Sequence, residues 1–322
     1  MTRIQPFVRI IALLALVASA ASASAQGVTL RYRWTKGETV TYRMTMLTAS
    51  AATGMPGVAE MKVDQTMTQV VTMMVEDVAS DGATTLRQTF VSVKMEMNGP
   101  IGHVAYDTAA PRANANPIVQ SIRQVLDGMV GESVTVVQAP DGAVRKVEGA
   151  SRILDKIVKS MPDGPSSQAA SQGLRSLLSD EALKTTMEQS FSKFPQHPVK
   201  PGDTWDGQMS VGNEASGRIG GTVTFTLKSL EGSPDAGVAR IAVGLRLKQE
   251  IAAPPGPNGM TLKLGEVRGE GELLFDAASG RVRKSTMKTD MPSTISGAGP
   301  DGNPVAMQNR TTTTVTMELV EK

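Results

Sequence analysis

The sequence has no cysteine, only two histidines, and aromatic residues that make up 3% of its 322 positions. Without cysteine the chain forms no disulfide, so a hydrophobic core must hold the fold together. Zinc sites of the usual kind need several His or Cys ligands, and the isolated His103 and His197 do not supply them. These shortages exclude a disulfide scaffold. They also predict that the protein holds no metal ion or other cofactor.

Motifs for catalysis and nucleotide binding are missing as well. No P-loop or G-x-G-x-x-G turn stands between a strand and a helix, and no G-x-S-x-G sequence accompanies the histidines. An S-x-x-K pattern occurs at 190–193 and at 285–288, without the companion S-D-N and K-T-G elements. Carboxylates such as Asp107, Asp203 and Glu266 are spread through the chain, and sequence alone does not pair them. The sequence therefore favours a protein that is not an enzyme.

The N-terminal residues have the three regions of a cleavable secretory signal. Arg3 and Arg9 precede an apolar run over residues 10–17, and small residues follow as far as the A-S-A sequence at 23–25. The run is shorter than the roughly 20 apolar residues that cross a bilayer, and A-x-A is a cleavage site. We therefore expect cleavage after Ala25 and a location in the periplasm or outside the cell.

Removal of this signal neutralises the chain. The full sequence has 33 basic and 31 acidic residues, and residues 1–25 hold two of the basic ones and no acid, which leaves 31 of each. Nucleic-acid-binding proteins carry a clustered excess of Lys and Arg. The sequence therefore predicts that nucleic acid is not a partner. No later stretch is apolar for long enough to predict a transmembrane segment after cleavage.

Apolar residues alternate with polar ones through the first and last parts of the chain. The stretch from residue 60 to 75 is the clearest case, and a period of two marks half-buried antiparallel strands. Between residues 117 and 195 the period becomes that of amphipathic helices, with Asn116 and Ser179 as capping residues. We expect an α+β fold with two antiparallel meanders, twisted or curved, and the amphipathic helices packed on them.

Two pairs of similar sequences predict that the meanders are related by duplication. Residues 36–39 (KGET) open the first meander and residues 201–204 (PGDT) open the second, while 136–146 resembles 274–284. The unequal offsets indicate an insertion or deletion between the halves. The predicted organisation is a signal peptide (1–25), a first β module (26–116), helices with a β hairpin (117–197) and a second β module (198–322).

Three stretches form a recognisable set: LRYRWTKGETVTYRM at 30–44, the segment 106–149, and FPQHPVKPGDTWDG at 194–207. Together they resemble an uncharacterised family of exported bacterial proteins whose members carry a domain of unknown function. The resemblance covers nearly the whole chain after the signal and rests on turns and strand openings. It implies a bacterial origin and a shared architecture, and it transfers no catalytic or binding residue.

Methionine is abundant, with 19 residues, and four of them form pairs at strand spacing. Met44 and Met46 point to one face of a strand, and so do Met95 and Met97, because strand side chains alternate. Such pairs fill a core that lacks Phe and Trp, line an adaptable apolar groove, or bind Cu(I). The scarcity of His and the lack of a Met-rich loop weigh against copper. These four residues are the candidate ligand-binding residues.

The sequence thus predicts an exported, non-catalytic protein that binds an apolar ligand, or a protein partner, in a Met-lined groove. One alternative is a structural or assembly component of the bacterial envelope with no small ligand. A solid core in place of the groove would favour that role. The other alternative is a hydrolase, which requires Ser, His and acid side chains to converge in one cleft.

Overall fold

A computed structural model describes residues 27–54, 60–100, 102–111, 116–160, 171, 179–190, 193–213, 217–233, 236–256, 259–298 and 304–320. The predicted signal peptide and its cleavage site lie outside these residues.

The described strands form one antiparallel sheet of thirteen strands. Its path runs β6-β5-β3-β2-β1-β13-β12-β11-β9-β8-β7, while β4 pairs with β3 and β10 pairs with β12. The strands are β1 (Thr39–Thr53), β2 (Met61–Val78), β3 (Thr84–Gly99), β4 (Gly102–Asp107), β5 (Ser133–Gln138), β6 (Val144–Glu148), β7 (Thr204–Asn213), β8 (Gly217–Glu231), β9 (Val238–Ile251), β10 (Thr261–Leu264), β11 (Val267–Asp276), β12 (Arg281–Ala298) and β13 (Pro304–Val320).

The predicted α+β class is wrong, because the chain is a β-rich protein built on a single sheet. β1 pairs with β13 from Thr41 opposite Val320 to Thr53 opposite Gln308, which fuses the two expected meanders. The helices of the described part are short: α1 (Pro117–Met129), α2 (Ala150–Ser160) and α4 (Asp180–Ser190). A period of two identifies a half-buried strand but not the strand beside it. The module boundaries proposed from the sequence stay a prediction.

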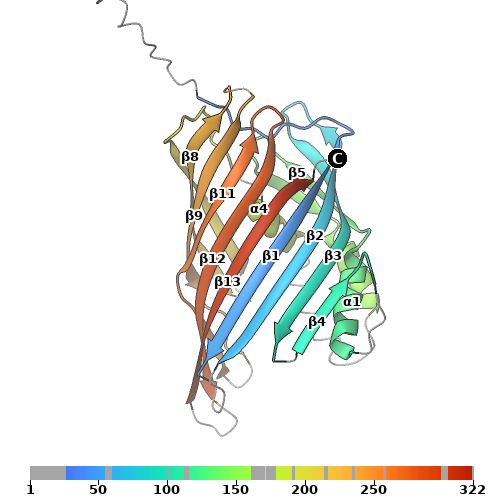
Figure 1. The fold of residues 1–322 in the computed structure, drawn as a ribbon, viewed down its shortest axis with the longest axis vertical. Coiled ribbons are helices and arrows are strands. Elements are labelled where there is room, and N and C mark those ends of the chain that lie inside the picture. The colour runs from blue at the N-terminus through green and yellow to red at the C-terminus, as the bar shows by residue number, and fades with distance from the viewer. Residues whose placement is uncertain are drawn as a thin grey trace, which may run out of the picture.

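The sheet curls around α4. Eleven strands lie along its path, so a flat sheet would separate the edge strands β6 and β7 by about 48 Å. Yet α4, a helix of 11 residues and therefore only about 16 Å long, contacts both. The sheet must therefore bend until its two edges reach the same helix. Figure 1 shows α4 behind the long central strands, on the concave side of the sheet.

The hydrophobic core lies on this concave face. One buried cluster gathers apolar side chains of β8, β9 and β11 around Phe275. A second joins β2, β3, β5 and β6 to the helices through Ile153, Ile157 and Met187. A third packs α1 against β3 and β4. The caps expected for two of these helices are present: Ile118 N donates to Asn116 Oδ1 at 2.9 Å, and Ala182 N donates to Ser179 Oγ at 3.1 Å.

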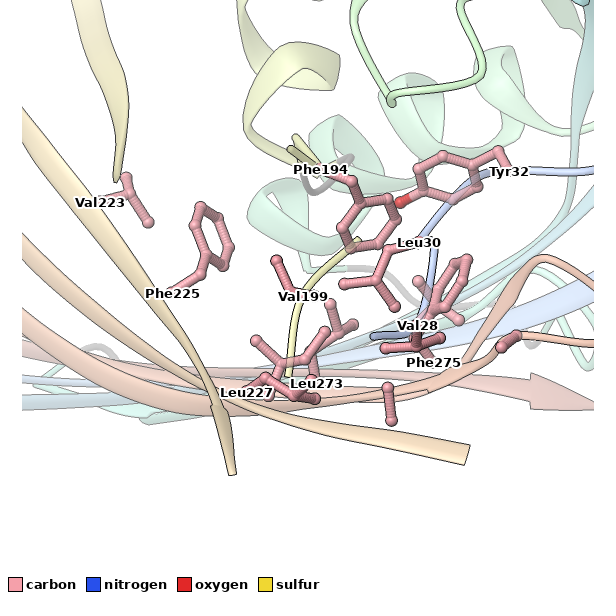
Figure 2. Close-up of a cluster of buried hydrophobic side chains, with 14 of the residues drawn as sticks. Val28, Leu30, Tyr32, Phe194, Val199, Val223, Phe225, Leu227, Leu273 and Phe275 are labelled. Carbon is pink, nitrogen blue, oxygen red and sulfur yellow. The ribbon is translucent and has the colours of Figure 1, made fainter. Parts of the chain in front are cut away.

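Residues 27–34, the N-terminal segment, lie across part of the concave face. Val28 pairs with Val199, and Tyr32 N donates to Pro140 O at 2.8 Å. The Tyr32 ring contacts those of Phe194 and Phe275, with centroids 5.3 and 5.7 Å away. Figure 2 shows these three rings together above the sheet, with Leu30 beside them. The N-terminal segment therefore fills this part of the concave face with a solid apolar core.

Arg281 of β12 connects the N-terminal segment to the sheet and to Glu38, the residue before β1. Its guanidinium donates to Arg33 O at 3.3 Å, pairs with the Glu38 carboxylate and lies 4.8 Å from the centre of the Trp34 ring. Trp34 Nε1 in turn donates to Gln138 Oε1 at 3.0 Å. Only 12% of the Arg281 side chain is exposed. One half-buried cation thus joins β12, the residue before β1 and the N-terminal segment, and Trp34 extends the connection to β5.

Replacing Arg281 by Ala should lower the free energy of unfolding by about 3 kcal/mol, because the half-buried Glu38 carboxylate is then left without its cationic partner. Urea unfolding followed by circular dichroism measures this change. Arg310→Ala is the control, since Arg310 pairs with Asp290 on the surface with 72% of its side chain exposed. It should cost only about 0–1 kcal/mol. Equal losses in the two variants would contradict the role of Arg281.

Asp276 organises the turn between β11 and β12. Its carboxylate accepts hydrogen bonds from Ala278 N at 2.9 Å and Ser279 N at 3.1 Å, and from the Arg283 guanidinium at 2.6 Å. Burial raises the pKa of Asp276. The backbone donors and the Arg283 charge together outweigh burial and hold its pKa below the usual range.

Because the folded pKa of Asp276 is lowered, its ionised form contributes fully to stability above the unfolded pKa of about 3.9. That contribution is lost as the pH falls through the lower folded value. Asp276→Asn should therefore destabilise the protein by about 1–3 kcal/mol at pH 7, and the difference from wild type should shrink below about pH 4. Urea unfolding at pH 7, 5 and 3 tests this. A difference that stays constant over this range would contradict it.

Candidate functional site

A cavity of about 510 Å³ lies against the concave face of the sheet. The central strands β1, β2, β12 and β13 form one wall, and β7, β8 and β9 form the other. Two residues of the helical region, Glu188 in α4 and Lys193 after it, complete the lining. Most of the lining is apolar: Met44, Met46, Met67, Met209, Met287, Met317, Val223, Val243, Val315, Leu245 and Phe225.

The methionines meet because of the strand register. Met67 lies opposite Met46, Met46 lies opposite Val315, and Val315 lies opposite Met287. In the neighbouring row Met44 lies opposite Met317. Directly opposed side chains in an antiparallel pair have Cβ atoms about 4.5–5.5 Å apart. Residues far apart in the sequence therefore form one continuous thioether surface, which we call the methionine rows.

Two glycines lie close to the cavity, Gly271 on β11 and Gly207 on β7. Gly271 lies between Met287 and Val243 in the register, where a Cβ would meet Thr286 O at 2.2 Å. The close approach of the backbone therefore requires glycine there. At Gly207, by contrast, a Cβ would meet nothing nearer than a ring carbon of Phe225 at 3.7 Å. Gly207 faces the cavity, so this position leaves room that a larger side chain would occupy.

The charged groups of the lining, in the part of the chain that the structure describes, are Glu188 and Lys193. Trp205 stacks on Phe225 with centroids 5.6 Å apart, and its Nε1 donates to Lys193 O at 3.0 Å. This bond holds the backbone of Lys193 beside the cavity. A mostly apolar hollow with a few polar groups is typical of a small-molecule site.

The sequence-predicted site residues separate in the structure. Met44 and Met46 line the cavity. Met95 and Met97 pack in the cluster beneath α1, whose buried members include Val119 and Leu126. That any of the four methionines binds a ligand stays a prediction. Sequence reasoning did not pick out Met67, Met209, Met287 and Met317 as site residues, because they reach the cavity from four other strands.

The residues of the other motifs are not brought together. Ser285 lines the cavity, whereas Lys288 lies on a different groove of the protein. His103 shares a hydrogen bond of 2.8 Å with Asn98 in an exposed position, and His197 is exposed. Among the described residues, no three His, Cys, Asp or Glu side chains are grouped as a metal site. Within the same ranges, no helix is both long and apolar enough to cross a bilayer.

Residues 81–282 match the model of a family of unknown function, DUF6263. The chain belongs to this family. The expectation of an uncharacterised family is thus confirmed, while export and duplication stay predictions. The matched range begins at the turn before β3 and ends at the start of β12. It therefore includes the β7–β9 wall of the cavity but neither β1 nor β13.

The DUF6263 chain has distant likenesses among solved structures, and no curated protein matches it. A structure titled for lipid–protein interactions in lipovitellin is 10% identical, with a TM-score of 0.43, over 90% of this chain and 26% of that one. DynF from the dynemicin biosynthesis pathway of Micromonospora chersina is 12% identical, with a TM-score of 0.21, over 92% and 86%. An outer membrane channel from Pseudomonas putida F1 is 9% identical, with a TM-score of 0.22, over 88% and 97%.

The chain spans about a quarter of the length of the lipovitellin chain. All three TM-scores are below 0.5, so these likenesses carry no information about what the DUF6263 chain binds.

Gly207→Leu should fill the cavity and leave the fold intact, because nothing lies within 3.7 Å of the new Cβ. We expect the affinity for the apolar dye N-phenylnaphthylamine, measured by its fluorescence, to fall by about tenfold or more, since the inserted side chain takes the space of the ligand. The matched control is Gly244→Leu. A Cβ on Gly244 would meet only Thr224 O at 3.9 Å, and Gly244 alternates with the cavity-lining Val243 and Leu245. An equal effect of both substitutions would show that the dye binds elsewhere.

Proposed function

We propose that this protein is an exported, non-catalytic carrier that binds an apolar ligand between the methionine rows and the β7–β9 wall. The observation that carries the proposal is the hollow itself. About 510 Å³ on the concave face remains unfilled by the side chains of the described residues. Unfilled apolar space destabilises a fold in proportion to its volume, and a ligand that occupies it restores the lost contacts.

The lining supports an apolar ligand of variable shape. Six methionines surround the cavity, and methionine adapts to irregular partners because its side chain is unbranched and polarisable. Thioethers also bind Cu(I). The size of the hollow favours a molecule over a single ion, since pockets of about 300–1,000 Å³ are typical of sites for small organic ligands.

Binding, not catalysis, fits the polar groups of the cavity. His103 and His197 lie outside its lining, and the charged groups that the described residues contribute to it are one acid and one lysine. A hydrolase of the Ser-His-acid kind needs a general base beside its nucleophile. Ser285 is the serine of the lining and has no histidine among the lining residues. The described part of the lining therefore offers contacts to a bound molecule without a Ser-His-acid set that would cleave it.

Native mass spectrometry of the mature protein, purified from a bacterial envelope, tests the proposal. We expect an additional small-molecule mass that disappears after organic extraction, and a polypeptide that begins at Gln26. The additional mass should also be missing from Gly207→Leu and present in Gly244→Leu, because only the first substitution fills the cavity. A bare polypeptide mass for the wild type before extraction would instead favour a structural component of the envelope.

A further inference from the structure

The concave face changes its chemistry along the central strands. On β1 the residues that face inward run Met44, Met46, Thr48 and Ser50. On β13 the run is Met317, Val315, Thr313 and Thr311. The register places Thr48 opposite Thr313 and Ser50 opposite Thr311. We call these four hydroxyl residues, together with Thr289 opposite Thr313 on β12, the hydroxyl patch. Thr289 lines the cavity, and the other four continue the inward face of β1 and β13 beyond its lining.

The hydroxyl patch is a connected, half-buried set of hydrogen-bonding groups. Ser50 Oγ and Thr311 Oγ1 are 2.8 Å apart, and Thr48 Oγ1 and Thr313 Oγ1 are 3.5 Å apart. Thr289 Oγ1 donates to Thr313 O at 3.4 Å, and Asn309 Nδ2 donates to Thr311 Oγ1 at 3.2 Å. A hydroxyl has one donor and two acceptor lone pairs. Each hydroxyl pair uses only one of its two hydroxyl hydrogens, so both donor and acceptor capacity remain for a polar group of a ligand.

The floor beneath the cavity and the hydroxyl patch carries no charge in the described part of the chain. The inward positions of β1, β2 and β13, and those of β12 from Ser285 onward, hold only apolar, hydroxyl or amide side chains. The charged residues of β12 and β13 alternate with them and pair on the other face, as Lys284 with Glu318 and Arg310 with Asp290 do. Burial of an unpaired charge against such a floor is costly, whereas a hydroxyl or ester finds partners.

The spacing fits an elongated molecule. From Met44 to Ser50 the strand advances about 20 Å at roughly 3.3 Å per residue. We propose that the ligand is a long-chain amphiphile with an uncharged, hydroxyl- or ester-bearing polar end. Its hydrocarbon chain lies along the methionine rows and its polar end lies over the hydroxyl patch. This inference rests on the proposed function, and it adds the chemical class and the orientation of the ligand.

A ligand whose anionic head group lies beside Lys193 is the alternative to this orientation. Its side chain lines the cavity and is exposed, so an anionic head group at that position would gain an ion pair. The two arrangements differ in the charge that the site prefers. Monopalmitoylglycerol, palmitate and hexadecyltrimethylammonium present similar chains with neutral, anionic and cationic ends. Displacement of N-phenylnaphthylamine from the mature protein measures the affinity of each.

We expect monopalmitoylglycerol to bind more tightly than either charged probe. The double variant Thr48→Val with Thr313→Val should weaken its binding by about fivefold, the factor for a lost hydrogen bond of ordinary strength. Palmitate binding should change little in this variant. The matched control is Thr45→Val with Thr316→Val, a directly opposed pair on the other face of the same strands, and it should bind all probes as wild type does.

Tighter binding of palmitate that Lys193→Gln removes would overturn the inference. So would unchanged binding of monopalmitoylglycerol to the double variant. In both cases the probes still bind in the cavity and the proposed function stands. If no probe displaces the dye, the proposed function falls together with the inference. Should the double variant unfold, Ser50→Ala in the same hydroxyl patch tests the same loss.

Discussion

The enclosed core, the cavity and the packing of α4 all depend on the bend that brings both edges of one sheet to this helix. A flat sheet of the same strands would leave the methionine rows on an open surface and the helix on one edge only. Backbone features make the bend possible. The register shifts at Val70/Val71, Leu227/Ser229 and Leu274/Phe275, and such irregularities increase the local twist of a strand. At Gly271 the neighbouring backbone comes too close for any side chain. The bend gives the sheet one enclosed face and one solvated face, which is why charged pairs such as Lys284 with Glu318 and Arg310 with Asp290 lie on the convex side.

The distribution of a few large side chains decides which part of the enclosed face is solid. Tyr32, Phe194 and Phe275 form a compact aromatic group beneath the N-terminal segment, and Arg281 ties that segment to the sheet. The neighbouring part has mainly methionine and glycine, and its rings are those of Phe225 and Trp205. With aromatic residues at only 3% of the sequence, the chain cannot fill both parts in the same way. The cavity is therefore a consequence of composition as well as of curvature.

Local signals in the sequence predicted local structure well. The caps at Asn116 and Ser179 are present, and the two similar turns at Gly37 and Gly202 make the same bonds: Gly37 N donates to Val75 O at 2.9 Å, and Gly202 N donates to Leu227 O at 2.7 Å. The pairing of β1 with β13 was not predictable in this way, because strands with the same alternation have no local mark of their partner. The same limit applies to the site. Met44/Met46 and Met95/Met97 have identical spacing, but the second pair lies beneath α1. Met287 and Met317 belong to the site only because the register of β1, β13 and β12 places them near Met46 and Met44.

The two halves of the chain meet where β1 pairs with β13, and we call these two strands the seam strands. The halves have the same connectivity: β1-β2-β3-β5-β6 and β7-β8-β9-β11-β12 each follow sequence order, with a short strand off the path after the third. Of the six methionines in the cavity, only Met209 falls within residues 81–282, the range matched to the family. The hydroxyl patch has one member on β12 and four on the seam strands, and all five lie outside that range. In our proposal these residues set the length and polarity of the ligand. The range matched to the family therefore includes the β7–β9 wall, while in our proposal the choice of ligand depends on the central strands that join the two halves of the sheet.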